Sequence, residues 1–135
     1  MLYGLGCAHV HDVQSRVLAE SHYCSTEGFT RLAIDNSIAL REAFIVREVA
    51  GVVTLTGQLP GEGRVLFEFR PALRSSPVRQ VEPDRRGSFR IRDVAPGVYC
   101  FKAMAYGWTS VLGVMSVEPD ANRGARLILD LPIGN

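Results

Sequence analysis

The chain has 135 residues, of which 47% are hydrophobic and 21% are charged, and its formal net charge is +1. These values are ordinary for a globular chain with one core of normal size, and they exclude an intrinsically disordered one. No run approaches the roughly 18 consecutive apolar residues of a membrane span, so we expect no such segment. The N-terminus has neither a basic start nor a sustained apolar run, so we see no signal peptide and take a cytoplasmic location as the default expectation.

The three cysteines, Cys7, Cys24 and Cys100, are too few and odd in number to form a disulfide framework. Disulfide scaffolds in small domains use several paired cysteines. We therefore expect reduced thiols.

Positive charge is concentrated in residues 64–92, which hold eight arginines against three acidic residues, while the rest of the chain has a net charge of −4. Arginine binds phosphate and carboxylate groups through its planar fork, so these arginines are candidates for contact with an anion or an acidic partner. The candidates are Arg74, Arg79, Arg85 and Arg86. We do not expect nucleic acid, because only Phe89 interleaves with the later arginines and the chain has no glycine-rich phosphate loop. A solvated face, or salt bridges to the acidic remainder, is the alternative.

Beyond residue 45, short segments rich in β-branched and aromatic residues alternate with turns of Gly, Pro, Asn and Asp. We expect strands at residues 47–56, 64–70, 78–81, 88–92, 98–105, 109–117 and 126–131. This spacing predicts an all-β fold, a seven-stranded antiparallel sandwich of the immunoglobulin-like or transthyretin-like kind, over residues 46–135.

Several of these segments alternate with a period of two, as half-buried strands do. The inward positions are expected to be Val65, Phe67 and Phe69, then Phe89 and Ile91, then Tyr99, Phe101 and Ala103, and finally Leu127, Leu129 and Leu131. Arg90 and Arg92 are expected to point outward.

Residues 1–45 are expected to form an N-terminal arm that packs on the sandwich or on another subunit. Asp12 is placed to cap a short helix, and residues 29–34 and 38–45 each have strand character. These pieces are too short to form a core of their own.

The run GSFRIRDVAPGVYCFKAMAYGW, residues 87–108, resembles the signature of carboxypeptidase regulatory-like domains. The segments VAGVVTLTG, GEGRVLFEFRP and ARLILDLP look like the first two strands and the last strand of that family. The resemblance covers about two-thirds of the chain and implies a transthyretin-like sandwich that accompanies other proteins without catalysing a reaction itself. Related enzymes need histidines within the sandwich, and this chain has none after His22.

Two further groups of residues are candidate sites. Thiolate and imidazole are ligands for zinc or copper, and five such side chains fall within eighteen residues of the arm, although their spacing matches no established zinc pattern. These are Cys7, His9, His11, His22 and Cys24. The alternative is that they are scattered residues of an interface arm, and we expect no cofactor. Tyr106 and Trp108 flank Gly107 and are candidates for stacking on a ligand such as a sugar ring, or for completing a core or an interface.

Catalysis has little support, because the chain contains no nucleophile-elbow motif G-x-S-x-G and its histidines all lie in the arm. We therefore expect a non-catalytic structural or assembly module that binds another protein or itself as a homo-oligomer. The alternative is an accessory module that binds carbohydrate or another ligand.

Overall fold

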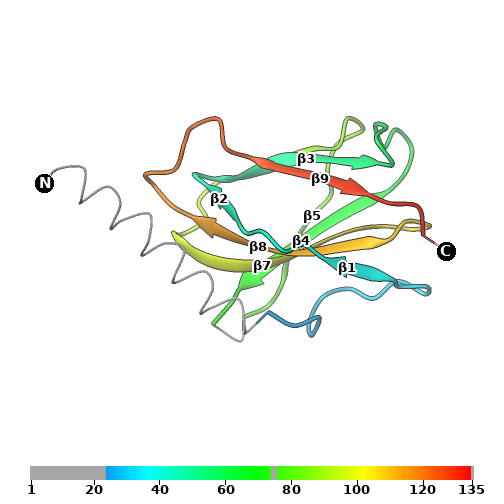
Figure 1. The fold of residues 1–135 in the computed structure, drawn as a ribbon, viewed down its shortest axis with the longest axis horizontal. Coiled ribbons are helices and arrows are strands. Elements are labelled where there is room, and N and C mark those ends of the chain that lie inside the picture. The colour runs from blue at the N-terminus through cyan, green and yellow to red at the C-terminus, as the bar shows by residue number, and fades with distance from the viewer. Residues whose placement is uncertain (1–23, 74–75, 135) are drawn as a thin grey trace, which may run out of the picture.

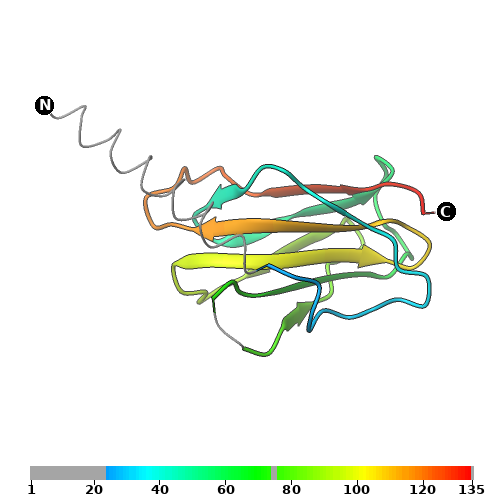
Figure 2. The same cartoon turned by 60° about the horizontal axis from the view of Figure 1, so that its bottom comes forward.

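The computed structural model describes residues 24–73 and 76–134, which form nine strands in two sheets (Figures 1 and 2). The six-stranded sheet, called here the larger sheet, has the order β1-β8-β7-β4-β5, and β2 also pairs with β8. The three-stranded smaller sheet has the order β6-β3-β9. The strands are β1 (Ser37–Ala39), β2 (Phe44–Val46), β3 (Val49–Leu55), β4 (Val65–Pro71), β5 (Arg79–Val81), β6 (Ser88–Ile91), β7 (Gly97–Ala105), β8 (Ser110–Val117) and β9 (Leu127–Leu131).

The all-β sandwich expected from the sequence is confirmed, and its seven predicted strands correspond to β3 through β9. The expected number of strands was too low, because β1 and β2 add two more from the N-terminal arm. The expected antiparallel arrangement also holds only in part, since β1 and β2 run parallel to β8 and β9 runs parallel to β3. Periodicity shows where a strand lies and which face it buries, whereas strand direction depends on which segments pair.

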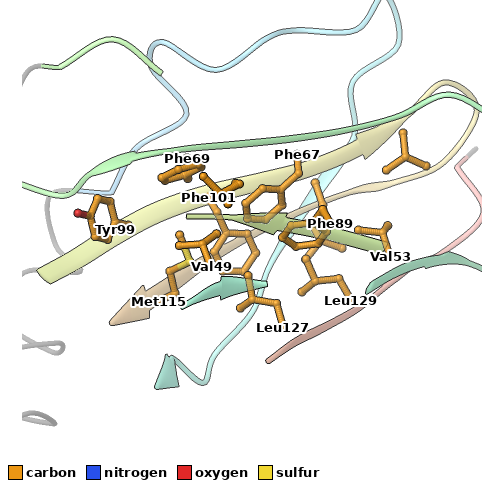
Figure 3. Packing of buried hydrophobic residues seen from close by; sticks show 14 of the residues in the cluster. Val49, Val53, Phe67, Phe69, Phe89, Tyr99, Phe101, Met115, Leu127 and Leu129 are labelled. Carbon is orange, nitrogen blue, oxygen red and sulfur yellow. The ribbon is translucent and has the colours of Figure 1, made fainter. Parts of the chain in front are cut away.

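The core lies between the two sheets and is built around aromatic rings. The Phe67 ring stacks on Phe89 of the opposite sheet with centroids 4.4 Å apart, and its centroid lies 5.6 Å from that of Phe101. Figure 3 shows these rings packed with Leu127 and Leu129. All of the predicted inward positions are buried. Truncation of such a ring to alanine typically costs about 3–5 kcal/mol, so these positions account for much of the stability.

A tight turn before β6 depends on a glycine. Gly87 has a φ of +79°, which favours glycine, and an added Cβ would lie only 2.0 Å from the Val53 carbonyl oxygen. The Asp84 carboxylate accepts hydrogen bonds from the backbone N–H groups of Arg86 and Ser88 at 2.9 and 3.0 Å. The turn predicted at these residues therefore brings β6 against β3.

Residues 24–36, which we call the strap, cross the outer face of the larger sheet. A disulfide joins Cys24 to Cys100 of β7, 76 residues later in the chain, with Cα atoms 5.5 Å apart. Phe29 is buried beside it with Ala72 and Val98. The expectation of reduced thiols is therefore wrong for Cys24 and Cys100, because pairing depends on proximity in the fold and not on the number of cysteines.

Beneath the strap, two charged side chains on neighbouring strands are buried, Glu68 at 2% exposure and Lys102 at 3%. The Glu68 carboxylate accepts hydrogen bonds from the Thr30 N–H at 2.7 Å, from the Gln80 amide at 2.6 Å and from the Thr30 hydroxyl. Lys102 Nζ donates to the Thr30 carbonyl at 2.7 Å and to Asp35 Oδ2 at 2.7 Å. The second predicted strand was expected to be half-buried, but the strap covers its outer face as well.

The arm segments differ from expectation. Residues 29–34 are not a strand, because the strap bonds to side chains of the sheet and does not join a sheet edge. The segment 38–45 is divided into β1 and β2, since residues 40–43 leave the edge of β8 between them. The helix expected after Asp12 lies outside the described residues. Within residues 24–73 and 76–134 there is no helix that is long and apolar enough to cross a membrane.

Removing the disulfide should destabilise the protein. Replacing Cys24→Ser together with Cys100→Ala frees a loop of 76 residues in the unfolded chain, which lowers the free energy of unfolding by about 4.5 kcal/mol in the chain-entropy account. Denaturant unfolding followed by tryptophan fluorescence measures this, with Cys7→Ser as the control for loss of a thiol. Equal unfolding midpoints for the oxidised protein and the double variant would contradict the pairing.

Candidate functional site

An apolar pocket of about 120 Å³, called here the end pocket, lies where β7 turns into β8. Three parts of the chain meet there: the strap, the β7–β8 turn and the C-terminal residues. Figure 1 shows the C-terminus and the β7–β8 turn at the same end of the molecule. The pocket is lined by Ile34, Asn36, Tyr106, Gly107, Trp108 and Gly134.

Two glycines allow these segments to meet. Gly107 has a φ of +92° in the turn that the Trp108 N–H closes on the Ala105 carbonyl at 3.0 Å. The Gly134 N–H donates to the Gly107 carbonyl at 3.1 Å, and an added Cβ on Gly134 would lie only 3.2 Å from that oxygen. A side chain at Gly134 would therefore require the backbone of the turn or of the C-terminal residues to shift by a few tenths of an ångström.

The pocket offers apolar surface more than hydrogen-bonding groups. Ile34 and Tyr106 are 70% and 72% exposed, and neighbouring Ile133, which pairs with Trp108, is 65% exposed. The Trp108 indole N–H already donates to the Thr56 hydroxyl at 3.2 Å. Large apolar side chains gathered at a solvent-facing hollow are typical of a surface that binds another apolar group.

The sequence singled out Tyr106 and Trp108, and the structure places both at this pocket. Ile34, Asn36 and Gly134 were missed, because they lie far away in the sequence and only the fold brings them to the turn. No local motif could have identified them.

The metal-site hypothesis loses one of its five residues. The Cys24 sulfur is bonded to Cys100 and so provides no thiolate for a metal ion. Cys7, His9, His11 and His22 lie outside the described residues. Within the described ranges, no group of three or more His, Cys, Asp or Glu side chains is arranged to hold a metal ion.

The arginine candidates occupy different settings. The Arg79 guanidinium lies over the Phe69 ring, 5.2 Å from its centroid. Arg85 forms an exposed ion pair with Glu62 at 2.7 Å, and Arg86 is exposed in the turn that Asp84 caps. Arg74 lies outside the described residues. Arg79, Arg85 and Arg86 therefore contact an aromatic ring, an acidic side chain and solvent, respectively.

A polar hollow of about 300 Å³ contains three arginines that are close in space, Arg47, Arg90 and Arg92, together with Glu48 and Asp93. Arg90 Nε donates to Glu48 Oε1 at 3.0 Å, and this hydrogen bond with the carboxylate raises the pKa of the Arg90 guanidinium. Two acidic side chains among three arginines leave little excess charge for an anion. This hollow is therefore a weak candidate for anion binding.

A larger hollow of about 310 Å³ lies beside the disulfide. It is bordered by Phe29 of the strap, by Leu40 and Ala43 of the linker between β1 and β2, and by Leu112 and Val114 of β8. It opens where the linker leaves the β8 edge between the two short parallel ladders. The hollow therefore results from the path that the chain takes between β1 and β2.

Lys102 is the most enclosed cation among the described residues, and its contacts are structural. Its ammonium group is bonded to Asp35 and Thr30, and the Ser110 hydroxyl donates to the other oxygen of Asp35 at 3.1 Å. These contacts fix the strap on the sheet and leave the ammonium group away from solvent.

Comparison with known proteins yields no match: no family model matches the chain, and no curated protein matches it in sequence. Function is therefore inferred from the fold, from the end pocket and from the chemistry of the residues that line it. Among the described residues, the end pocket combines an apolar hollow with the exposed side chains of an isoleucine and a tyrosine beside it.

Replacing Lys102→Met should lower the free energy of unfolding by roughly 3 kcal/mol, because removing one member of a buried pair leaves a charge without its partner. Asp35 retains some contact with solvent, at 17% side-chain exposure, so the loss should fall at the low end of the usual range. Denaturant unfolding measures the change.

The matched control for this variant is Arg85→Met, which breaks the exposed Arg85–Glu62 ion pair and should change stability by less than about 1 kcal/mol. A Lys102→Met variant as stable as this control would show that the buried pair does not hold the strap.

Proposed function

We propose that the chain is a non-catalytic structural or assembly module that binds another protein through the end pocket. The observation that supports this most is the gathering of exposed Ile34 and Tyr106 around an apolar hollow of about 120 Å³. The hollow has room for one aliphatic or aromatic side chain of a partner. Tyrosine and tryptophan are enriched among the residues that carry most of the binding energy in protein interfaces.

The rigidity of the pocket supports the same function. Trp108 is held by its hydrogen bond to Thr56, the turn is closed by Gly107, and the C-terminal residues are bonded to that turn. A site that is already formed loses less conformational entropy when a partner binds. A short apolar segment of another protein therefore suits this surface.

Carbohydrate binding is the second candidate, and the exposed Tyr106 ring is the feature in its favour. A sugar needs several hydrogen-bonding groups around the stacking ring. Here Trp108 already donates its indole N–H to Thr56, and Asn36 is the one amide side chain among the lining residues. The pocket therefore suits an apolar protein side chain better than a sugar.

We propose in addition that the sandwich is related to carboxypeptidase regulatory-like domains. In support, the residues on which the resemblance rests have structural roles in the sandwich. Gly87 closes a turn with positive φ, Phe89 and Tyr99 are buried, and Gly97 begins β7. The Tyr99 hydroxyl donates to the Ala95 carbonyl at 2.6 Å across the Pro96-Gly97 turn.

The disulfide indicates the kind of cellular compartment in which such a module functions. Disulfides persist in oxidising compartments and are rare in the reducing cytosol. The Cys24–Cys100 bond therefore supports a location in an oxidising compartment rather than the cytoplasmic default expected from the sequence.

A peptide-display selection on the immobilised oxidised chain tests the proposed function. We expect enriched peptides to share an apolar anchor and to change the fluorescence of the single tryptophan, Trp108, because that residue lines the pocket. Tyr106→Ser and Ile34→Ser should each weaken binding at least tenfold, or about 1.4 kcal/mol.

The control is Leu59→Ser, which removes a side chain of similar exposure, 62%, that does not line the pocket. The proposal fails if enriched peptides bind Tyr106→Ser and Ile34→Ser as tightly as they bind the unaltered chain. Binding on a glycan array that depends on Tyr106, with no peptide enriched, would favour the carbohydrate alternative.

A further inference from the structure

The outer edge of β9 is an open sheet edge within the described part of the chain. In the described part of the chain, β9 is the last strand of the smaller sheet and pairs only with β3, as Figure 1 shows. The Leu131 carbonyl accepts from the Thr56 N–H at 2.9 Å, so the backbone groups of Leu131 point toward β3. Successive residues of a strand direct these groups to opposite edges. The backbone groups of Ile128 and Asp130 therefore face the open edge.

The side chains at the same alternate positions are exposed. Ile128 is 59% exposed, and Asp130 and Arg126, which directly precedes the strand, are also exposed. Leu127 and Leu129 are buried in the core. An apolar side chain on an edge strand with unpaired backbone groups is a template for pairing with another strand.

The sequence of this edge is complementary to itself. When two copies of β9 pair antiparallel about Ile128, each Ile128 faces the partner's Ile128, and each Arg126 faces the partner's Asp130. Arg126 forms no ion pair within the described residues, and Asp130 uses its Oδ1 to accept from Thr54 and Gly57. The three cross-strand pairs join residues whose backbone groups face the open edge, which allows roughly six backbone hydrogen bonds. Opposite charges placed directly across such a ladder stabilise it.

Other registers fit less well. Shifting the pairing toward the C-terminus places Ile128 opposite Asp130 and brings in Pro132, which has no N–H to donate. Shifting the centre to Arg126 places two arginines opposite each other. The register centred on Ile128 therefore combines the most hydrogen bonds with matched charges.

Two further exposed isoleucines lie at the edge of the larger sheet on this side of the sandwich. Phe89 of β6 stacks on Phe67 of β4, and β9 contacts β7 and β8 across the core, so the β9 edge lies on the side of the larger sheet that ends in β1 and β2. Those two strands carry Ile38 and Ile45, which are 44% and 37% exposed.

We propose that the chain forms a two-fold symmetric dimer in which β9 pairs antiparallel with β9 of a second copy and joins the two smaller sheets into one. A two-fold axis needs a surface that is complementary to itself, which the Arg126, Ile128 and Asp130 positions supply. This interface goes beyond the proposed function and uses a different surface, so each can fail without the other. A dimer carries two end pockets and would bind a bivalent partner more tightly than a single chain.

Charge exchange across the interface tests the proposal. Light scattering after size exclusion should give the oxidised chain twice its 14.8 kDa mass. Arg126→Glu alone places two acidic groups opposite each other, and Asp130→Arg alone places two arginines opposite each other, so each variant should dimerise at least tenfold more weakly. An equal mixture of the two variants restores both opposite-charge pairs and should form the heterodimer.

Ile128→Lys is the second variant if loss of the Asp130 contacts to Thr54 and Gly57 unfolds Asp130→Arg. It places two ammonium groups at the two-fold axis and should give monomers that retain the circular dichroism of the folded chain. Monomeric wild type, or dimers of unchanged strength in Arg126→Glu and Ile128→Lys, would overturn the proposal.

Crosslinking tests the register. In a Cys7→Ser background, Ile128→Cys should form a disulfide between two copies, because directly opposed hydrogen-bonded residues have Cα atoms about 5.5 Å apart, within the range for a disulfide. Arg126→Cys is the matched control, since its two copies would lie about four residues, or roughly 14 Å, apart along the ladder. Crosslinking through Arg126→Cys but not Ile128→Cys would contradict the register. Tyr106→Ser should dimerise normally, which separates this interface from the end pocket.

Discussion

The attachment of the strap to the outer face of the larger sheet is the constraint on which the rest of the structure depends. Glu68 and Lys102 lie side by side on β4 and β7, and charged groups are costly to bury unless they are paired and hydrogen-bonded. Thr30 and Asp35 supply those partners, while the Cys24–Cys100 bond holds the start of the strap in place. This attachment also delivers β1 to the edge of β8 and brings Ile34 to the end pocket.

The two proposed surfaces arise from different properties of the sandwich. The end pocket exists because a β-hairpin turn, the strap and the C-terminal residues meet at one end of the molecule. The β9 edge exists because the smaller sheet has only three strands and the described residues provide no fourth. A binding pocket and a self-complementary edge on separate surfaces suit a module that assembles and binds at the same time.

The candidate sites show how far local sequence can go. Tyr106 and Trp108 were identified because two aromatic residues flank a glycine, a local feature, and both line the end pocket. Cys24 is a candidate metal ligand in the sequence because it follows His22 closely, whereas its partner in the fold is Cys100, 76 residues later in the chain. The spacing of residues along the chain identifies a site only where residues that are close in sequence also line the same site in the fold.

The sequence by itself determined the class of the fold, seven of its strands and the inward positions of the core, because a strand with one buried face imposes a period of two on its residues. Only the tertiary structure decided that the outer face of the larger sheet is covered, that Glu68 and Lys102 are buried, and that β1, β2 and β9 pair in parallel. These features arise from contacts between residues far apart in the chain. The alternation within a strand records which side it buries, but it carries no information about which other segment lies against it.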